Sequence, residues 1–377
     1  MRIWRQNFIR KDILMTTLFL MLNFLLPIID DRMKSQFNIS KYIIFDLPNG
    51  TMFNHNFQPS ISIYTNSEFD FKNCPFCTNI KKTNFSNSSQ RDVVITYASS
   101  SLKNVFPFIR SLRSTGCKAT VVFLIDDEAY KAISHDTFDL LKNCSVKVIN
   151  FGKLKNKIGH PQIYALKHLS CYDFLIEYYA LFDRVLLIDL YDVYFQKDPF
   201  TPEIGYDRLY VAEEFRQIGH NDKYNFERVQ KIYKIPKSLY GRTTLNAGIL
   251  YGSPYVLLNF YKLYFSMFDV KRLKETHITC DQGYLNYFML TDQLNKEGLN
   301  FKGLSYRDGY HNLASIPRDW FMKKDFTFGN LTLNNYEQVV VHQYDRSRKI
   351  TYNLLANCPQ GNYNVTPADY VREMFVG

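Results

Sequence analysis

Two aspartates stand directly after an apolar segment in the middle of the chain. Val185–Ile188 runs into Asp189, and Asp192 follows three positions later. Two carboxylates brought together at the mouth of a sheet repel each other, and a divalent cation relieves that repulsion. Mg²⁺ and Mn²⁺ prefer oxygen ligands and are commonly held by one or two carboxylates together with substrate phosphates. This spacing alone favours two ordinary strand-end aspartates, and a Mn²⁺ or Mg²⁺ site is the alternative that the later motifs strengthen.

Three further groups of polar residues border apolar segments later in the chain. Each alone has a structural interpretation, as a helix cap, a buried histidine or a solvated basic loop, and the order of the groups is the informative feature. They are Asn246 and Gly248 before an apolar strand, Asp281 and Gln282 at the start of an amphipathic helix, and His342 ahead of Arg348 and Lys349. A histidine at a strand end followed by basic residues suits a metal ligand and a diphosphate clamp.

The elements that must position these residues alternate between strands and helices from residue 91 onward. This alternation predicts parallel β-α-β units and therefore an α/β fold, in which ligands bind at the carboxyl ends of the strands. The expected strands are Asp92–Ala98, Ala119–Ile125, Val146–Phe151, Val185–Leu190, Leu209–Glu213, Gly248–Tyr251 and Gln338–His342. The expected helices are Ser101–Ser114, Glu128–Lys142, Gln162–Phe182, Tyr255–Phe268 and Gln282–Leu290.

The composition is that of a globular protein. The 377 residues are 46% hydrophobic and 22% charged, which excludes overall disorder, a collagen-like chain and a multi-span membrane protein. The net charge of +10 is spread along the chain, so we expect no nucleic-acid partner. Aromatic residues make up 16%, and most are expected to pack in the core.

One apolar stretch, Ile13–Ile29, lies near the N-terminus and follows four basic residues. At 1.5 Å rise per residue it reaches roughly 25 Å, adequate for a thin internal bilayer. Positive charge on the N-terminal flank keeps that end in the cytosol. We therefore expect a cytosolic tail at 1–12, a transmembrane signal anchor at 13–29, a luminal stem at 30–90 and the main domain at 91–377. A cleaved signal peptide is the alternative.

Cysteines and glycosylation sequons agree with a luminal chain. There are seven cysteines, an odd number, so at least one stays free or pairs between molecules. Cys74 and Cys77 lie in a polar loop and are predicted to form structural disulfides rather than a redox or zinc motif. Asn-x-Ser/Thr sequons begin at Asn38, Asn49, Asn84, Asn87, Asn143, Asn330 and Asn364.

The ordered motifs resemble those of the GT-A-fold nucleotide-sugar glycosyltransferases, nearest the group containing glycogenin and the bacterial lipopolysaccharide galactosyltransferases. That group has an Asp-x-Asp metal motif, an Asn-x-Gly segment, an Asp-Gln-x-x-x-Asn helix start and a late His-x-x-Gly-x-x-Lys. The matching residues are Asp189/Asp192, Asn246/Gly248, Asp281-Gln282/Asn286 and His342/Arg348. The resemblance covers about Asp92 to Lys349. It implies a Rossmann-like, mostly parallel mixed sheet flanked by helices in one catalytic domain, as in single-pass type II enzymes of the Golgi or endoplasmic reticulum.

The resemblance also implies a role for each residue in transfer from a nucleotide-diphosphate sugar, expected to be a UDP-sugar, with retention of anomeric configuration. The acceptor is expected to be a glycan, glycoprotein or glycolipid. The implied metal ligands for Mn²⁺ or Mg²⁺ are Asp189, Asp192 and His342. The implied donor-binding residues are Ala98, Ser99, Gly248, Arg348 and Lys349. The residues implied to contact the donor sugar or its reacting face are Asn246, Asp281 and Gln282.

The chain departs from the family pattern at several positions. Two residues rather than one separate the aspartates, Asp345 stands in place of the late glycine, and Arg348 replaces the lysine. The family also carries a basic residue on the helix before the metal strand, near Tyr172 here. Lys167 or His168, about one turn earlier, is the candidate substitute.

Two other functions fit the same elements. A non-catalytic lectin or scaffold protein of the secretory pathway is the main alternative, and turnover of a sugar nucleotide with Mn²⁺ separates it from a transferase. A sugar-phosphate nucleotidyltransferase would carry a glycine-rich loop after its first strand. The segment after that strand, Ala98-Ser-Ser-Ser-Leu, contains no glycine.

Overall fold

The computed structural model describes residues 73–80, 86–150, 163–218, 239–266, 281–291, 293–312 and 329–358. The expected tail and anchor, and most of the expected stem, lie outside these ranges. Among the residues that are described, none of the helices combines the length and the apolar character that a membrane span requires.

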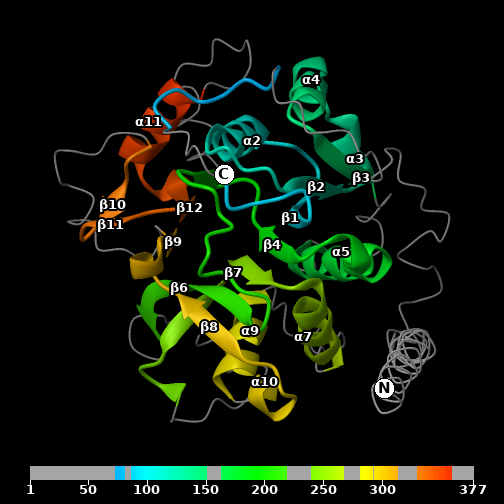
Figure 1. Cartoon of the computed structure of the whole chain (residues 1–377), viewed down its shortest axis with the longest axis vertical. Coiled ribbons are helices and arrows are strands. Elements are labelled where there is room, and N and C mark those ends of the chain that lie inside the picture. Colours follow the sequence, from blue (N-terminus) through cyan, green and yellow to red (C-terminus); the bar gives the residue numbers. More distant parts are fainter. Residues whose placement is uncertain are drawn as a thin grey trace, which may run out of the picture. The chain divides into compact units, whose positions relative to one another are not determined.

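A seven-stranded, mostly parallel sheet forms the centre of the described chain (Figure 1). Only β7 runs against its neighbours β4 and β6, and all other adjacent pairs are parallel. The expected α/β fold with a mostly parallel mixed sheet is thereby confirmed. In spatial order the strands are β3 (Val146–Asn150), β2 (Thr120–Ile125), β1 (Asp92–Ala98), β4 (Arg184–Ile188), β7 (Thr243–Gly252), β6 (Leu209–Gln217) and β8 (Phe301–Leu304).

Helices flank the sheet, with α2 on one side and α5 and α7 on the other (Figure 1). Because both faces are covered, β1 and β2 are buried at every residue, which explains their continuous apolar sequences. The helices are α2 (Val105–Ser114), α3 (Asp127–Lys131), α4 (His135–Asn143), α5 (Ile163–Tyr178), α7 (Pro254–Ser266), α9 (Asp281–Leu290), α10 (Gln293–Lys296) and α11 (Arg348–Asn357). Short 3₁₀ turns are η3 (Tyr179–Leu181), η5 (Tyr306–Asp308) and η8 (Tyr344–Arg346).

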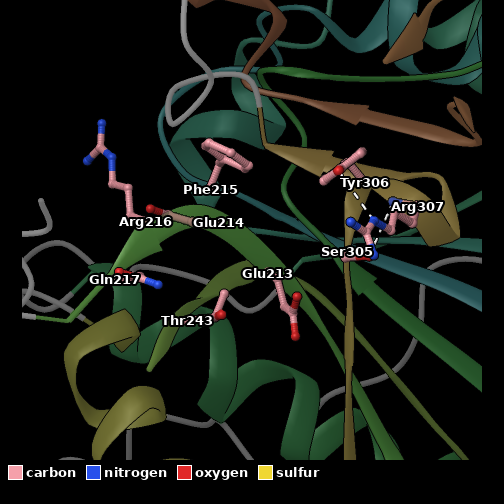
Figure 2. Close-up of a pocket in the computed structure, with 9 residues that line it drawn as sticks. All are labelled: Glu213, Glu214, Phe215, Arg216, Gln217, Thr243, Ser305, Tyr306 and Arg307. Atoms are coloured by element: carbon pink, nitrogen blue, oxygen red, sulfur yellow. Dashed lines mark hydrogen bonds between the residues drawn. The ribbon is translucent and has the colours of Figure 1, made fainter. Parts of the chain in front are cut away.

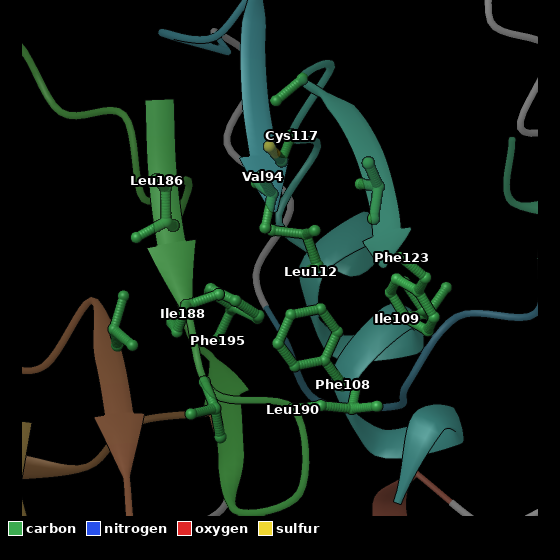
Figure 3. Packing of buried hydrophobic residues seen from close by; sticks show 14 of the residues in the cluster. Val94, Phe108, Ile109, Leu112, Cys117, Phe123, Leu186, Ile188, Leu190 and Phe195 are labelled. Carbon is green, nitrogen blue, oxygen red and sulfur yellow. The ribbon is translucent and has the colours of Figure 1, made fainter. Parts of the chain in front are cut away.

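A second, three-stranded sheet packs against α2. It consists of β5 (Val193–Phe195), β12 (Val340–His342) and β9 (Tyr310–Asn312), with β12 in the centre. The Phe108 ring of α2 stands edge-on to Phe123 of β2 and to Phe195 of β5, at centroid distances of 6.1 and 5.2 Å (Figure 3). Each such ring contributes roughly 1.5–3 kcal/mol by its burial. One helix therefore joins the two sheets, and this fixes β5 and β12 beside the end of β4.

A separate hairpin is formed by β10 (Thr332–Leu333) and β11 (Tyr336–Glu337).

Two disulfides tie residues 73–80 to the domain. Cys74 pairs with Cys144 after α4, and Cys77 pairs with Cys358 after α11. The expectation that Cys74 and Cys77 form structural disulfides is confirmed. Cys117 and Cys171 are buried free thiols, as the odd cysteine count requires of at least one residue.

Several elements differ from the sequence prediction, and β5, β8 to β11, α10 and α11 were not expected at all. The single helix expected at 128–142 is two helices, because Asp126 and Ser134 each accept a hydrogen bond from a backbone N–H and so cap a separate start. The strand expected at 248–251 begins five residues earlier, at Thr243. Asn246 consequently lies inside β7, and Gly248, expected as the first residue of the strand, lies in the middle of it, where β7 pairs with two neighbours.

Candidate metal centre

Three strand ends bring the predicted metal ligands together. Asp189 directly follows β4, Asp192 directly precedes β5, and His342 is the last residue of β12. Since β5 and β12 are antiparallel with Val193 opposite His342, the histidine is held beside Asp192. One ligand atom from each of the three side chains lies within 4.8 Å of the others.

The geometry and chemistry of these side chains suit Mn²⁺ or Mg²⁺. Nε2 of His342 lies 3.4 Å from Oδ2 of Asp189 and 3.3 Å from Oδ1 of Asp192. Ligands about 2.1 Å from one ion stand at most about 4.2 Å apart, so these atoms need to move little. His342 is 2% exposed, whereas Asp189 and Asp192 are 36% and 21% exposed. The carboxylates thus face solvent, where substrate oxygens can complete the coordination.

Gly248 makes room for this cluster. The backbone N–H of Asp189 donates to the carbonyl of Gly248 at 3.0 Å, which brings the two strands together at the site. A Cβ atom at position 248 would stand 2.7 Å from Oδ2 of Asp189 and 2.8 Å from Nε2 of His342. The glycine of the Asn-x-Gly motif is therefore explained by the close approach of Asp189 and His342, two of the candidate metal ligands.

The charges of the cluster perturb its pKa values strongly. Burial alone would lower the pKa of His342, but Asp192 and Asp189 outweigh this effect and raise it to about 10. Burial alone would raise the pKa of Asp189, but Lys167 and His342 hold it well below its usual range. Without a metal the cluster is an imidazolium between two carboxylates, and a metal ion must displace the imidazolium proton.

Both candidate basic residues of α5 reach the site, by different contacts. Nζ of Lys167 donates to Oδ1 of Asp189 at 2.9 Å and to the carbonyl of Ala247 at 3.1 Å, and it lies 3.3 Å from Oδ2 of Asp281. Nε2 of His168 lies 3.3 Å from the same oxygen of Asp281. Burial would lower the pKa of Lys167, but the two carboxylates raise it above its ordinary value. Lys167 is therefore the cation that joins Asp189, a candidate metal ligand, to Asp281.

Glu214 connects the remaining predicted residues. Its Oε1 accepts hydrogen bonds from Nδ2 of Asn246 and Nε2 of Gln282, both at 2.9 Å. Oδ1 of Asn246 in turn accepts from the backbone N–H of Gly248 at 2.7 Å. Glu214 is buried in β6, and sequence reasoning missed it because the expected strand ended at Glu213. The available signal was a pair of glutamates closing an otherwise apolar segment.

Residues 189–192, which carry both aspartates and are here named the metal loop, are tied to the end of β1 by Tyr191. The Tyr191 hydroxyl accepts from the backbone N–H of Ser99 at 3.2 Å and contacts the carbonyl of Ser101 at 2.9 Å. Oγ of Ser99 also donates to Asp126 at 2.5 Å. Ala98 and Ser99 thus lie beside the metal loop, whereas Tyr191 and Asp126 were not predicted.

No family model and no curated protein matches this chain. The mostly parallel mixed sheet and the Asp189–Asp192–His342 group are compatible with a GT-A fold. Whatever function is assigned to the chain therefore depends on its own side chains.

The expected diphosphate clamp lies at the start of α11. Arg348 and Lys349 are exposed in the first turn of α11, and their role stays a prediction. Asp345, at the position of the family glycine, is partly buried in η8. Burial, and then the charge of Asp192, raise the pKa of Asp345 above its ordinary value.

Proposed function

We propose that the chain is a metal-dependent glycosyltransferase that moves a sugar from a nucleotide-diphosphate donor, a UDP-sugar, to a glycan or glycoconjugate acceptor. The observation that carries the proposal is the group of Asp189, Asp192 and His342 at the carboxyl edge of a mostly parallel sheet. Gly248 supports the proposal, because a side chain at this position of β7 would clash with Asp189 and His342, where the proposed ligands meet.

The chain's own residues have distinct tasks in this proposal. Asp189, Asp192 and His342 hold Mn²⁺ or Mg²⁺, which supplies positive charge next to the departing diphosphate. Lys167 fixes the side-chain rotamer of Asp189 by donating to its Oδ1. The Oδ2 atom of the same carboxylate therefore stays directed at His342. Positioning of this kind is worth as much as an order of magnitude or two in metal affinity.

Asp281 is the proposed contact for a hydroxyl of the donor sugar. Burial would raise its pKa, but Lys167 and His168 lower it, so the carboxylate is ionised. Its side chain is 11% exposed, and an ionised carboxylate has about four lone-pair sites, more than Lys167, His168 and the backbone N–H of Gln282 use. Asn246 and Gln282, held by Glu214, form the wall next to it.

We also propose that this domain works in the lumen of the Golgi or endoplasmic reticulum, behind an anchor at 13–29. Two disulfides favour an oxidising compartment. Asn87 and Asn330 are exposed sequon residues and accessible to glycosylation. Protein expressed in cells should run faster on a gel after enzymatic removal of N-glycans. Unchanged mobility would contradict the luminal assignment.

The decisive experiment is a donor screen. Purified full-length protein is incubated with a panel of sugar nucleotides, with and without Mn²⁺, and release of nucleotide diphosphate is measured. Hydrolysis or transfer from at least one donor, dependent on Mn²⁺ and absent in Asp192→Ala, is expected. Failure with every donor, by protein that still binds glycans, would favour the non-catalytic lectin.

A further inference from the structure

A cavity of about 500 Å³ lies at the far end of β6 and β7 (Figure 2). The last residues of β6, the first residue of β7 and the turn after β8 form its wall. The pairing of β6 with β7 shifts in register on both sides of Glu213, and such bulges commonly redirect side chains beside functional sites. The lining residues are Glu213, Glu214, Phe215, Arg216, Gln217, Thr243, Ser305, Tyr306 and Arg307.

Two aromatic rings, Phe215 and Tyr306, line this cavity, and a third, Tyr336, contacts Tyr306. The Phe215 and Tyr306 rings are 6.3 Å apart between centroids, and the Tyr306 and Tyr336 rings are 5.9 Å apart. The Phe215 and Tyr336 side chains are 41% and 44% exposed, whereas Tyr306 is partly buried and packs against a core cluster that includes Leu333 and Val341. A group of neighbouring, partly exposed aromatic rings is typical of a ligand-binding surface.

The polar groups of the cavity balance one another. Two glutamates, Glu213 and Glu214, and two arginines, Arg216 and Arg307, line it. The Glu213 side chain is accommodated by Gly303 of β8, where a Cβ atom would stand 2.9 Å from Cγ of the glutamate. A cavity with hydrogen-bond donors and acceptors but no excess of either charge suits an uncharged polar ligand.

Glu214 links the cavity to the proposed transfer site. It lines the cavity, and its carboxylate accepts the hydrogen bonds of Asn246 and Gln282. Glu213 pairs with Leu245 of β7, three residues before Gly248 at the metal centre. At about 3.4 Å per residue this places the cavity roughly 10 Å from the metal ligands. A ligand that begins at the metal centre can therefore extend into it.

We propose that this cavity binds the acceptor and that the acceptor is an uncharged oligosaccharide. A pyranose has an apolar C–H face and a rim of hydroxyls, which match the Phe215–Tyr306 rings and the Glu213 and Arg307 head groups. The pyranose that stacks on these aromatic rings is not the sugar unit that receives the transferred sugar, but a unit further along the acceptor. The inference rests on the proposed glycosyl transfer and adds the substrate class of that site.

The test measures binding alone, with neither donor nor metal present. Full-length protein in detergent is applied to immobilised neutral glycans, sialylated or sulfated glycans, and peptides. Neutral glycans should be retained, and Phe215→Ala and Tyr306→Ala should each weaken retention about tenfold or more. The matched control is Phe138→Ala on α4, which removes an equally large ring that is 55% exposed and should change nothing. Binding of Mn²⁺ should be the same in all variants.

The outcomes separate this inference from the proposed function. Equal glycan binding by wild type and Phe215→Ala would overturn the cavity assignment, as would preference for acidic glycans or peptides. Absence of glycan binding by protein that hydrolyses a donor with Mn²⁺ would overturn it too, while leaving the transferase in place. Ring-dependent glycan binding without turnover of any donor would support the cavity and overturn the transferase.

Discussion

A methyl group on the α-carbon of Gly248 would stand 2.8 Å from Nε2 of His342, closer than real Cβ contacts come. The imidazole is 2% exposed and fixed at the end of β12, so it cannot turn aside cheaply. The close approach of these two residues thus ties the shape of β7 to the position of a candidate metal ligand.

Replacing Gly248 by alanine should therefore damage metal binding more than folding. Displacing His342 should lower Mn²⁺ affinity about 10–100-fold, measured by calorimetric titration. The overpacked site should cost about 1–3 kcal/mol in the free energy of unfolding, measured in urea. Gly252→Ala is the matched control in the same strand, since its nearest neighbour is a side-chain methyl of Val256 at 3.3 Å. Unchanged Mn²⁺ affinity in Gly248→Ala would show that the ion binds elsewhere.

The two aspartates should contribute alike to the metal site. Asp189→Ala and Asp192→Ala should each abolish Mn²⁺ binding, because each removes one of three ligand atoms within 4.8 Å. Circular dichroism should show an intact fold, since both side chains face solvent in part. A mild loss in Asp189→Ala beside a complete loss in Asp192→Ala would mean that the additional residue between them turns Asp189 away from the ion.

Local patterns predicted that Asp189, Asp192 and His342 meet, because strand ends obey a simple rule. Asp92–Ala98 is β1 to the residue, and the apolar segment before Asp189 is β4. His342 ends the last strand as expected. Each of these predictions needs only continuous burial and the position of strand carboxyl ends.

The supporting contacts could not be read from the sequence in the same way. Glu214 meets Asn246 and Gln282 across 32 and 68 residues, and no local pattern encodes such pairings. The choice between Lys167 and His168 depends on the rotation of α5, which its weakly amphipathic sequence leaves open. Only the folded arrangement shows that Lys167 reaches Asp189.

Lys167→Met should destabilise the metal-free protein by about 1–3 kcal/mol at pH 7, measured by urea unfolding. The change leaves Asp189 and Asp281 close together without their shared cation. The loss of stability is smaller than for a fully buried pair, because Asp189 is 36% exposed. Adding Asp281→Asn should restore part of the loss. No recovery in the double variant would mean that the lysine stem, not its charge, matters.

The stability difference between wild type and Lys167→Met should depend on pH. Both carboxylates have pKa values lowered in the folded state, so their contribution to stability is present above the unfolded value of about 3.9. It is lost as pH falls through the lower folded values. The stability difference between wild type and Lys167→Met should therefore be constant from pH 5 to 7 and shrink below about pH 4. A difference that grows on acidification would contradict the ion pair.

The two disulfides should differ in their stabilising effect. Cys77–Cys358 spans 281 residues and Cys74–Cys144 spans 70. Either double Cys→Ser variant should lose about 2–5 kcal/mol, and loop-closure entropy predicts about 1 kcal/mol more for the longer loop. Urea unfolding of both variants, with reduced wild type as the reference, measures the difference. A larger loss at Cys74–Cys144 would show that burial of residues 73–80 against α2 and α4, rather than chain entropy, dominates. A chain that begins at Gln90 loses both bonds, and its unfolding then reports whether residues 90–377 fold alone.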